Sequence, residues 1–289
     1  MNKRIRDILE FICIFAIAFG VVFLAINLTL DYRSKKALEE IRGGIKAARI
    51  QSEQIVIPDE AKALNEKKAS DEGTTVDSTD GPTKVIDSHG NDASVVAVNP
   101  ILQEYDKLFK ENSDFAGWIY VDGTEIDYPY MQGPDNEFYL SHNIERTYDK
   151  YGMLIMDVNC SLENDSPQMI VYGHNVNTGK LFGELLKYKE EAYFGYHPTI
   201  NFDTVRQTGE YEIFAVFLTT VSEAQNEQRL FTTWGFDNKE EFSRVTNWAK
   251  EKSLYDTGVI PEYGKPILTL VTCEHSRDEG RFVVMATKK

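Results

Sequence analysis

The chain has 289 residues, of which 42% are hydrophobic, so it exceeds one typical domain and can bury one sizeable core. Its formal net charge of −15 argues against nucleic acid as a partner, because phosphate binding needs a basic patch. Three cysteines are too few for a disulfide scaffold.

The first thirty residues have the pattern of a membrane anchor. Basic residues in 1–10 precede an uncharged apolar run, 11–30, which as a helix would span about 30 Å, the thickness of a bilayer core. A cleaved signal peptide is the alternative, but its apolar core would be shorter and would end at a small-residue site. We predict a single pass through the cell membrane, with residues 1–10 cytoplasmic and everything after Leu30 extracellular.

Residues 31–97 are predicted to form a stalk and a flexible linker. The segment from Asp31 to about Gln54 is compatible with a helix that Gly43-Gly44 interrupts, and the polar stretch after it has too few large apolar groups to offset its ordering entropy. An ordered domain is expected over 98–289, where Asn99-Pro100 is typical of a helix N-cap followed by Pro at the first helical position.

Short strand-like runs dominate this domain. Two of them, 115–121 and 124–130, are joined through Asp122-Gly123, a strong hairpin signal. Further strands are predicted at 152–156, 169–173, 198–203, 209–221, 267–272 and 281–287, with amphipathic helices at 179–188 and 238–253. We therefore predict a mainly β protein, a closed antiparallel or mixed β-barrel with peripheral helices, preceded by a transmembrane helix. No metal-ligand spacing is present, so neither a metal nor a cofactor is predicted.

A candidate catalytic group is spread over three strand ends. The apolar run 267–272 delivers Cys273 to the end of a strand, where Arg277 and Arg281 favour the thiolate that attacks carbonyls. His174 also follows a strand, and histidine is the usual acid and base beside a thiol. If the strands on either side of the last loop pair, Arg281 returns to the sheet edge of Cys273, where a guanidinium can stabilise an anionic intermediate.

Three alternatives remain for these residues. Cys273 could be a small buried hydrophobe, since free cysteines are among the most buried residues. Cys160 could pair with Cys273 in an exported domain, which would leave no reactive thiol. His275 is a rival base, although a near neighbour in sequence seldom reaches its own sulfur.

The run Thr269-Leu-Val-Thr-Cys273 resembles the T-L-x-T-C signature of sortases, with the histidine and arginine in the expected chain order. Papain-like and NlpC-type peptidases place the cysteine before the histidine, so the chain order here argues against them. The presence of a helix at 238–253, in the connection before the strand that ends in Cys273, resembles class B sortases more narrowly. Asn136 and Leu140 match an N-x-x-Y-L segment that helps line the class B substrate groove, although they could equally be a capping residue and a core residue.

Two positions near the cysteine complete the resemblance. Glu274 matches an acidic residue that follows the cysteine in some members, and the resemblance implies a contact with substrate. Val271 departs from the pattern, because class B members often have Ser there, so a hydroxyl that could contact substrate is absent.

The resemblance implies a membrane-anchored cysteine transpeptidase. Such an enzyme cleaves a sorting motif near the C-terminus of exported proteins, keeps the acyl group as a thioester on Cys273, and joins it to an amine of peptidoglycan or to a pilin lysine. Arg281, with the backbone N–H of Glu274, would stabilise the oxyanion, and His174 would move the protons. Two alternatives stay open, a cysteine endopeptidase of the same fold and an inactive ectodomain that binds peptides.

Overall fold

The computed structural model describes residues 3–54, 100–162, 166–224, 235–276 and 278–289, with side chains described from residue 12 to residue 50 of the first segment. Within these segments eight strands close into a barrel in the order β1-β2-β3-β4-β7-β8-β6-β5. The strands are β1 (Phe115–Tyr120), β2 (Asp127–Met131), β3 (Leu154–Met156), β4 (Gln168–Gly173), β5 (Thr199–Thr204), β6 (Glu210–Thr220), β7 (Ile267–Cys273) and β8 (Gly280–Lys288). The prediction of a mainly β, closed barrel is confirmed.

The barrel is mixed. Pairs β2–β3 and β4–β7 are parallel, whereas the other neighbours are antiparallel, and β5 pairs with β1 to close the sheet. The predicted hairpin is present as β1 and β2, with Gly123 in its turn at φ +76°, a value that favours glycine. Pro129 lies in β2 just before the β2–β3 ladder begins at Tyr130, so its missing N–H leaves no gap in that ladder.

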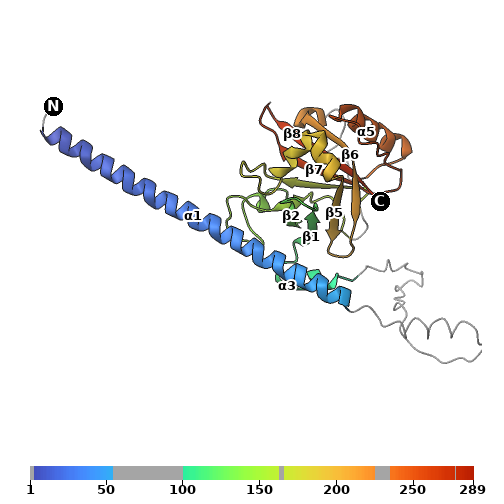
Figure 1. Ribbon diagram of the computed structural model, residues 1–289, viewed down its shortest axis with the longest axis horizontal. Helices are drawn as coiled ribbons and strands as arrows, with labels where there is room; N and C mark the ends of the chain where they lie inside the picture. Colours follow the sequence, from blue (N-terminus) through green and yellow to red (C-terminus); the bar gives the residue numbers. More distant parts are fainter. Residues whose placement is uncertain (1–2, 55–99, 163–165, 225–234, 277) are drawn as a thin grey trace, which may run out of the picture.

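Helices cover two sides of the barrel (Figure 1). The helix α5 (Lys239–Lys252) packs Phe242 and Val245 on the outer face of β6, β7 and β8, and its first turn is capped by Asn238, which accepts from the N–H of Glu241 at 2.8 Å. The helices α1 (Lys3–Gln54) and α3 (Gln103–Glu111) lie on the side of β1 and β2. The shorter η1 (Phe138–Leu140), η2 (Glu184–Lys189) and α4 (Glu191–Tyr196) follow the loops between strands.

Three helix predictions differ from the structure. The helix α1 runs through Gly43-Gly44 without a break, and its burial of Ile45 against the domain offsets the roughly 1 kcal/mol that each glycine costs in a helix. The helix predicted to start at Pro100 begins at Gln103, because Leu102 is extended and donates its N–H to the Val205 carbonyl at 2.8 Å. Asn99, its expected cap, lies outside the described residues.

The third difference concerns the helix predicted over 179–188. Gly179 and Leu181 have φ of +84° and +52°, in the left-handed region that a right-handed helix cannot include. Helical structure therefore starts only at Glu184, as the 3₁₀ helix η2, and continues as α4.

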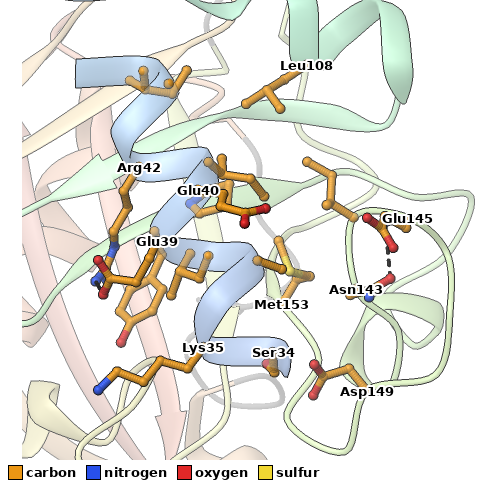
Figure 2. A pocket seen from close by; sticks show the side chains of 18 of the residues that line it. Ser34, Lys35, Glu39, Glu40, Arg42, Leu108, Asn143, Glu145, Asp149 and Met153 are labelled. Atoms are coloured by element: carbon orange, nitrogen blue, oxygen red, sulfur yellow. Dashed lines mark hydrogen bonds and ion pairs between the residues drawn. The ribbon is translucent and has the colours of Figure 1, made fainter. Parts of the chain in front are cut away.

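A cavity of about 730 Å³ separates part of α1 from the domain (Figure 2). Figure 2 shows Glu40 of α1 next to Met153, with Asp149 beyond it, while Lys35 and Glu39 extend from the other side of the helix. Cys273, His174 and Arg281 do not line this cavity, so it belongs to the docking of α1 and not to the proposed chemistry.

Gly173, the last residue of β4, is the first target for mutation. A Cβ there would lie 2.4 Å from Leu154 Cδ2 and 2.6 Å from Phe182 Cδ2, and both side chains are fully buried with no room to move. We expect Gly173→Ala to lower the free energy of unfolding by about 1–3 kcal/mol, the usual cost of overpacking, as measured by urea denaturation. Gly195→Ala is the control, because nothing lies within 4 Å of its added Cβ, and it should leave the stability within about 1 kcal/mol of wild type.

Candidate active site

Two parallel strands bring the histidine and the cysteine to one edge of the barrel. In the β4–β7 ladder Gly173 is opposite Thr272, so the residues that follow them, His174 and Cys273, lie at the same end of the sheet. The Thr272 hydroxyl donates to the Gly173 carbonyl at 2.7 Å and fixes this register just before the two side chains. Residues 99 positions apart in the chain are thereby neighbours.

Arg281 joins the same row from the third strand. The β7–β8 ladder is antiparallel and pairs Cys273 directly with Arg281, so both side chains point to the same side of the sheet. Cys273, His174 and Arg281 are all half-buried, which keeps each fixed by the barrel and open to a bound molecule. The predicted grouping of these residues at one sheet edge is what the pairing shows.

The imidazole of His174 is oriented by a backbone carbonyl. Its Nε2 lies 3.0 Å from the Leu140 oxygen, and because a carbonyl only accepts, Nε2 carries the proton in this arrangement. The carbonyl of His174 itself accepts from the Phe182 N–H at 3.2 Å, which holds the backbone of the loop. A histidine held at both ring and backbone is pre-oriented for proton transfer to a neighbour.

Asn175 is a residue that the sequence analysis did not single out. Its Nδ2 donates to the Cys273 carbonyl at 3.0 Å, so the side chain beside His174 holds the backbone of the cysteine. Its position directly after His174, where two parallel strands end together, is the signal that could have identified it.

The Gly280 carbonyl collects two donors beside Cys273. Arg281 Nη1 donates to it at 2.9 Å and so does the Glu274 N–H, also at 2.9 Å. The expectation that the Glu274 N–H stabilises an oxyanion is therefore wrong for this arrangement, because that donor extends the β7–β8 ladder. The Arg281 guanidinium has further N–H groups to donate, and oxyanion stabilisation by Arg281 stays a prediction.

The side chain of Glu274 is committed within the chain. Its carboxylate is 7% exposed, accepts from the Ser276 hydroxyl and N–H, and pairs with Lys189 Nζ at 3.0 Å. The Ser276 hydrogen bond, followed by the Lys189 contact, lowers the pKa of Glu274 from 4.5 to about 2. A substrate contact through Glu274 stays a prediction. In this structure its carboxylate braces the loop after Cys273 against Ser276 and Lys189.

The two predicted groove residues lie along the segment that reaches His174. Leu140 is half-buried at the end of η1, and its carbonyl is the one that orients the imidazole. Asn136 accepts from the Val158 N–H at 2.9 Å and donates to Asp157, which also accepts from the Tyr172 hydroxyl. Lining of a substrate groove by Asn136 and Leu140 stays a prediction.

The competing cysteine and histidine are placed apart from this row. Cys160 is 5% exposed within the barrel core, and burial raises the pKa of its thiol to about 12, so it is no nucleophile at neutral pH. All three cysteines are unpaired, so the alternative Cys160–Cys273 disulfide is not present. His275 is exposed in the loop after Cys273, and Arg277 lies outside the described residues. No group of three or more metal-ligating side chains occurs in the described segments.

Comparison with known proteins decides the family. A model of the sortase domain matches residues 119–289, which is more than half of the chain. The chain belongs to the sortase family. It is 33% identical to sortase B of Listeria monocytogenes over 196 residues, covering 67% of this chain and 77% of that protein.

Solved structures give the class. Sortase B of Clostridium perfringens is 31% identical at a TM-score of 0.59, covering 64% of this chain and 98% of that one. A sortase B structure complexed with triglycine is 29% identical at a TM-score of 0.59, covering 64% and 85%. The chain is therefore a class B sortase, a cysteine transpeptidase of the kind that acts in cell-wall anchoring.

The brace on Glu274 gives the sortase a pH-dependent stability. Because the folded pKa is about 2 and the ordinary value is 4.5, ionised Glu274 contributes stability above pH 4.5 that is lost as the pH falls toward 2. We expect Glu274→Gln to cost about 1 kcal/mol at neutral pH, and the gap between the two proteins to close between pH 4.5 and 2 in denaturant titrations. Glu251→Gln, on the exposed side of α5, should keep the wild-type pH profile, and a gap that is constant with pH would contradict the brace.

Removal of the Asn175 amide should loosen the pairing of His174 and Cys273. We expect Asn175→Ala to lower kcat about tenfold with a smaller change in KM, because misplacement of reacting groups reduces the rate of the chemical step more than binding. The exposed neighbour Asn177→Ala should retain wild-type kcat. Equal kcat in the two variants, measured on a cleaved peptide, would show that Asn175 has no positioning role.

Proposed function

We propose that this class B sortase is a membrane-anchored enzyme that cleaves a sorting-signal peptide of exported proteins through a thioacyl intermediate on Cys273. It then joins the acyl group to an amine of peptidoglycan or to a pilin lysine. The observation that carries the proposal is the single row formed by His174, Cys273 and Arg281 at the ends of β4, β7 and β8.

The first half of the reaction forms the thioester. The Cys273 sulfur attacks the peptide carbonyl, and Arg281, paired with Cys273 on the adjacent strand, stabilises the oxyanion of the tetrahedral intermediate. As the C–N bond breaks, His174 donates a proton to the leaving amine. The peptide downstream of the cleavage site leaves, and the acyl group stays on sulfur.

The second half returns the enzyme to its starting state. An incoming amine attacks the thioester carbonyl, and His174 takes the proton that this amine loses. The C–S bond breaks with its electron pair returning to sulfur, an amide forms, and the enzyme is again a Cys273 thiolate beside a protonated His174. The solved sortase B that is complexed with triglycine supports an amine of this kind as the acceptor.

The long first helix supports membrane anchoring. Among the described residues one helix, Ile12–Ile50, is long and apolar enough by composition to cross a membrane. The apolar side chains of residues 12–30 are exposed in the protein, as expected of a segment that lipid surrounds. With basic residues at its N-terminal side, we place the N-terminus in the cytoplasm and the barrel outside the cell.

Replacement of the three row residues should have different effects. We expect Cys273→Ala to abolish cleavage, His174→Ala to reduce kcat by at least about a hundredfold, and Arg281→Ala to reduce kcat more than it raises KM. Cys160→Ala is the matched control, because its buried thiol is protonated at neutral pH, and it should keep wild-type kcat. All four variants are compared with wild type by cleavage of a peptide library followed by mass spectrometry, which also identifies the sorting motif.

The same assay separates the proposal from its alternatives. Addition of triglycine should give a ligated product in place of the hydrolysed one, whereas an endopeptidase would give only hydrolysis. A thiol-reactive peptide probe should label Cys273 rapidly in wild type and slowly in His174→Ala. Absence of both cleavage and labelling would indicate an inactive peptide-binding domain and would overturn the proposal.

A further inference from the structure

The barrel packs against the side of α1. The sequence predicted a stalk and a flexible linker over residues 31–97, with a helix-compatible segment from Asp31 to about Gln54. In the structure α1 continues past Leu30 to Gln54 as one helix and lies against the domain (Figure 1). Three basic residues tie the two together at the two ends and the middle of this contact. They are Lys180, Arg42 and Arg49.

The first tie lies at the membrane end of the docked helix. Asp31 directly follows the apolar run, and its carboxylate pairs with Lys180 Nζ at 3.0 Å. The Lys180 contact, together with the hydrogen bond from Tyr151, lowers the pKa of Asp31, so this carboxylate is charged at neutral pH. Lys180 also lies over the ring of Tyr151, at 4.6 Å from its centroid.

This tie also joins the membrane end of α1 to the active site. Lys180 lies on the loop that begins with His174, and Asn175 is bridged to Leu181 across that loop, while the Phe182 N–H donates to the His174 carbonyl. His174 is therefore near Lys180 in space as well as in sequence. The Cα atoms of His174 and Asp31 are no more than about 25 Å apart. This limit adds the Asn175–Leu181 bridge, one residue on each side of it, and the paired side chains of Lys180 and Asp31. The loop that follows His174 is thus tied directly to the membrane end of the docked helix.

The other ties lie farther along α1. Arg42 Nε donates to the Asp127 carbonyl at 2.7 Å, and its guanidinium covers the ring of Tyr128. Arg49 Nη2 donates to Asp203 at 2.6 Å and to the Tyr105 hydroxyl at 2.6 Å.

These three ties fix the orientation of the barrel. Asp31 and Arg49 are separated by about 27 Å of straight helix, so contacts at both ends and in the middle prevent the barrel from tilting or sliding along α1. Between them α1 also packs Leu38, Ile41 and Ile45 on the domain, and the cavity of Figure 2 interrupts this apolar packing. A barrel held this way stays at one height above the bilayer.

We infer that the docked part of α1 is a ruler, which makes the enzyme select peptides whose cleavage site lies at one distance from the membrane. The inference rests on the proposed function, because it needs the membrane span and the peptide substrate. A barrel on a flexible linker would reach sites over a wide range of heights, since the mean extension of such a linker fluctuates broadly. A barrel fixed on a rigid helix presents Cys273 at a single height, so substrates with shorter or longer spacers lose effective concentration.

The test uses the full chain in liposomes and a peptide that the chain cleaves in solution. This peptide is attached to a lipid anchor through Pro-rich spacers of about 10 to 40 residues, which extend by ~3.1 Å per residue. We expect wild type to show one narrow optimum of spacer length, with cleavage falling at least about fivefold on either side of it. A flat profile in wild type, with the free peptide still cleaved, would overturn the ruler and leave the proposed function intact.

A released variant tests the ties themselves. Arg42→Ala, Arg49→Gln and Asp203→Asn together remove two ties without leaving a buried unpaired carboxylate. We expect this variant to cleave free peptide within about twofold of wild type and to lose the narrow optimum. Lys46→Ala is the matched control, because Lys46 is exposed on the same helix, and it should keep the optimum.

Helix release is measured independently by the reactivity of a buried position. Ile45 is 5% exposed against the domain, so Ile45→Cys in a Cys273→Ala background should be alkylated slowly when α1 is docked and at least about tenfold faster in the released variant. Slow alkylation in the released variant would show that the arginines do not hold the helix and would overturn the inference. Fast alkylation with an unchanged spacer optimum would overturn it as well. Loss of free-peptide cleavage in wild type would instead contradict the proposed function.

Discussion

The parallel pairing of β4 with β7 is the constraint on which the rest of the site depends. These strands are far apart in the sequence, and their register is fixed at the active end by the hydrogen bond from Thr272 to Gly173 and by that from Asn175 to Cys273. Because side chains alternate along a strand, a slip of one residue would turn His174 to the opposite face from Cys273. The tight packing of Gly173 on Leu154 and Phe182 keeps β4 in this register.

Closure of the barrel makes that register rigid. Each of the eight described strands has two neighbours, so none of them is a free edge, and the ends of β4, β7 and β8 are held in one row. The loops add their own supports, since the Leu140 carbonyl orients His174 and the Gly280 carbonyl holds Arg281. The proposed reacting groups are on strand ends, and the carbonyls that orient His174 and Arg281 come from the loops.

The site and the docking of α1 depend on a few locally placed cations and not on the net charge of the chain. Although the net charge of the chain is −15, cations lie next to the proposed site and at the contact with α1. Arg281 is paired with Cys273, Lys189 pairs with the buried Glu274, and Lys180 lies on the loop that follows His174. Each of these cations meets an acidic or backbone oxygen within the protein. A strongly acidic chain therefore presents an arginine where an oxyanion is expected to form.

The sequence by itself determined the fold class, the family and the order of most elements. Apolar runs that end in His174 and Cys273, an arginine at the start of the last strand, and the Asp122-Gly123 turn are local signals, and they sufficed for the barrel and the family. Only the tertiary structure decided that the Glu274 N–H is committed to Gly280, that Leu140 orients His174, that Asn175 holds Cys273, and that α1 docks on the domain through Gly43-Gly44. These features depend on hydrogen bonds and packing between segments tens of residues apart, and a local pattern carries no record of which distant group completes a contact.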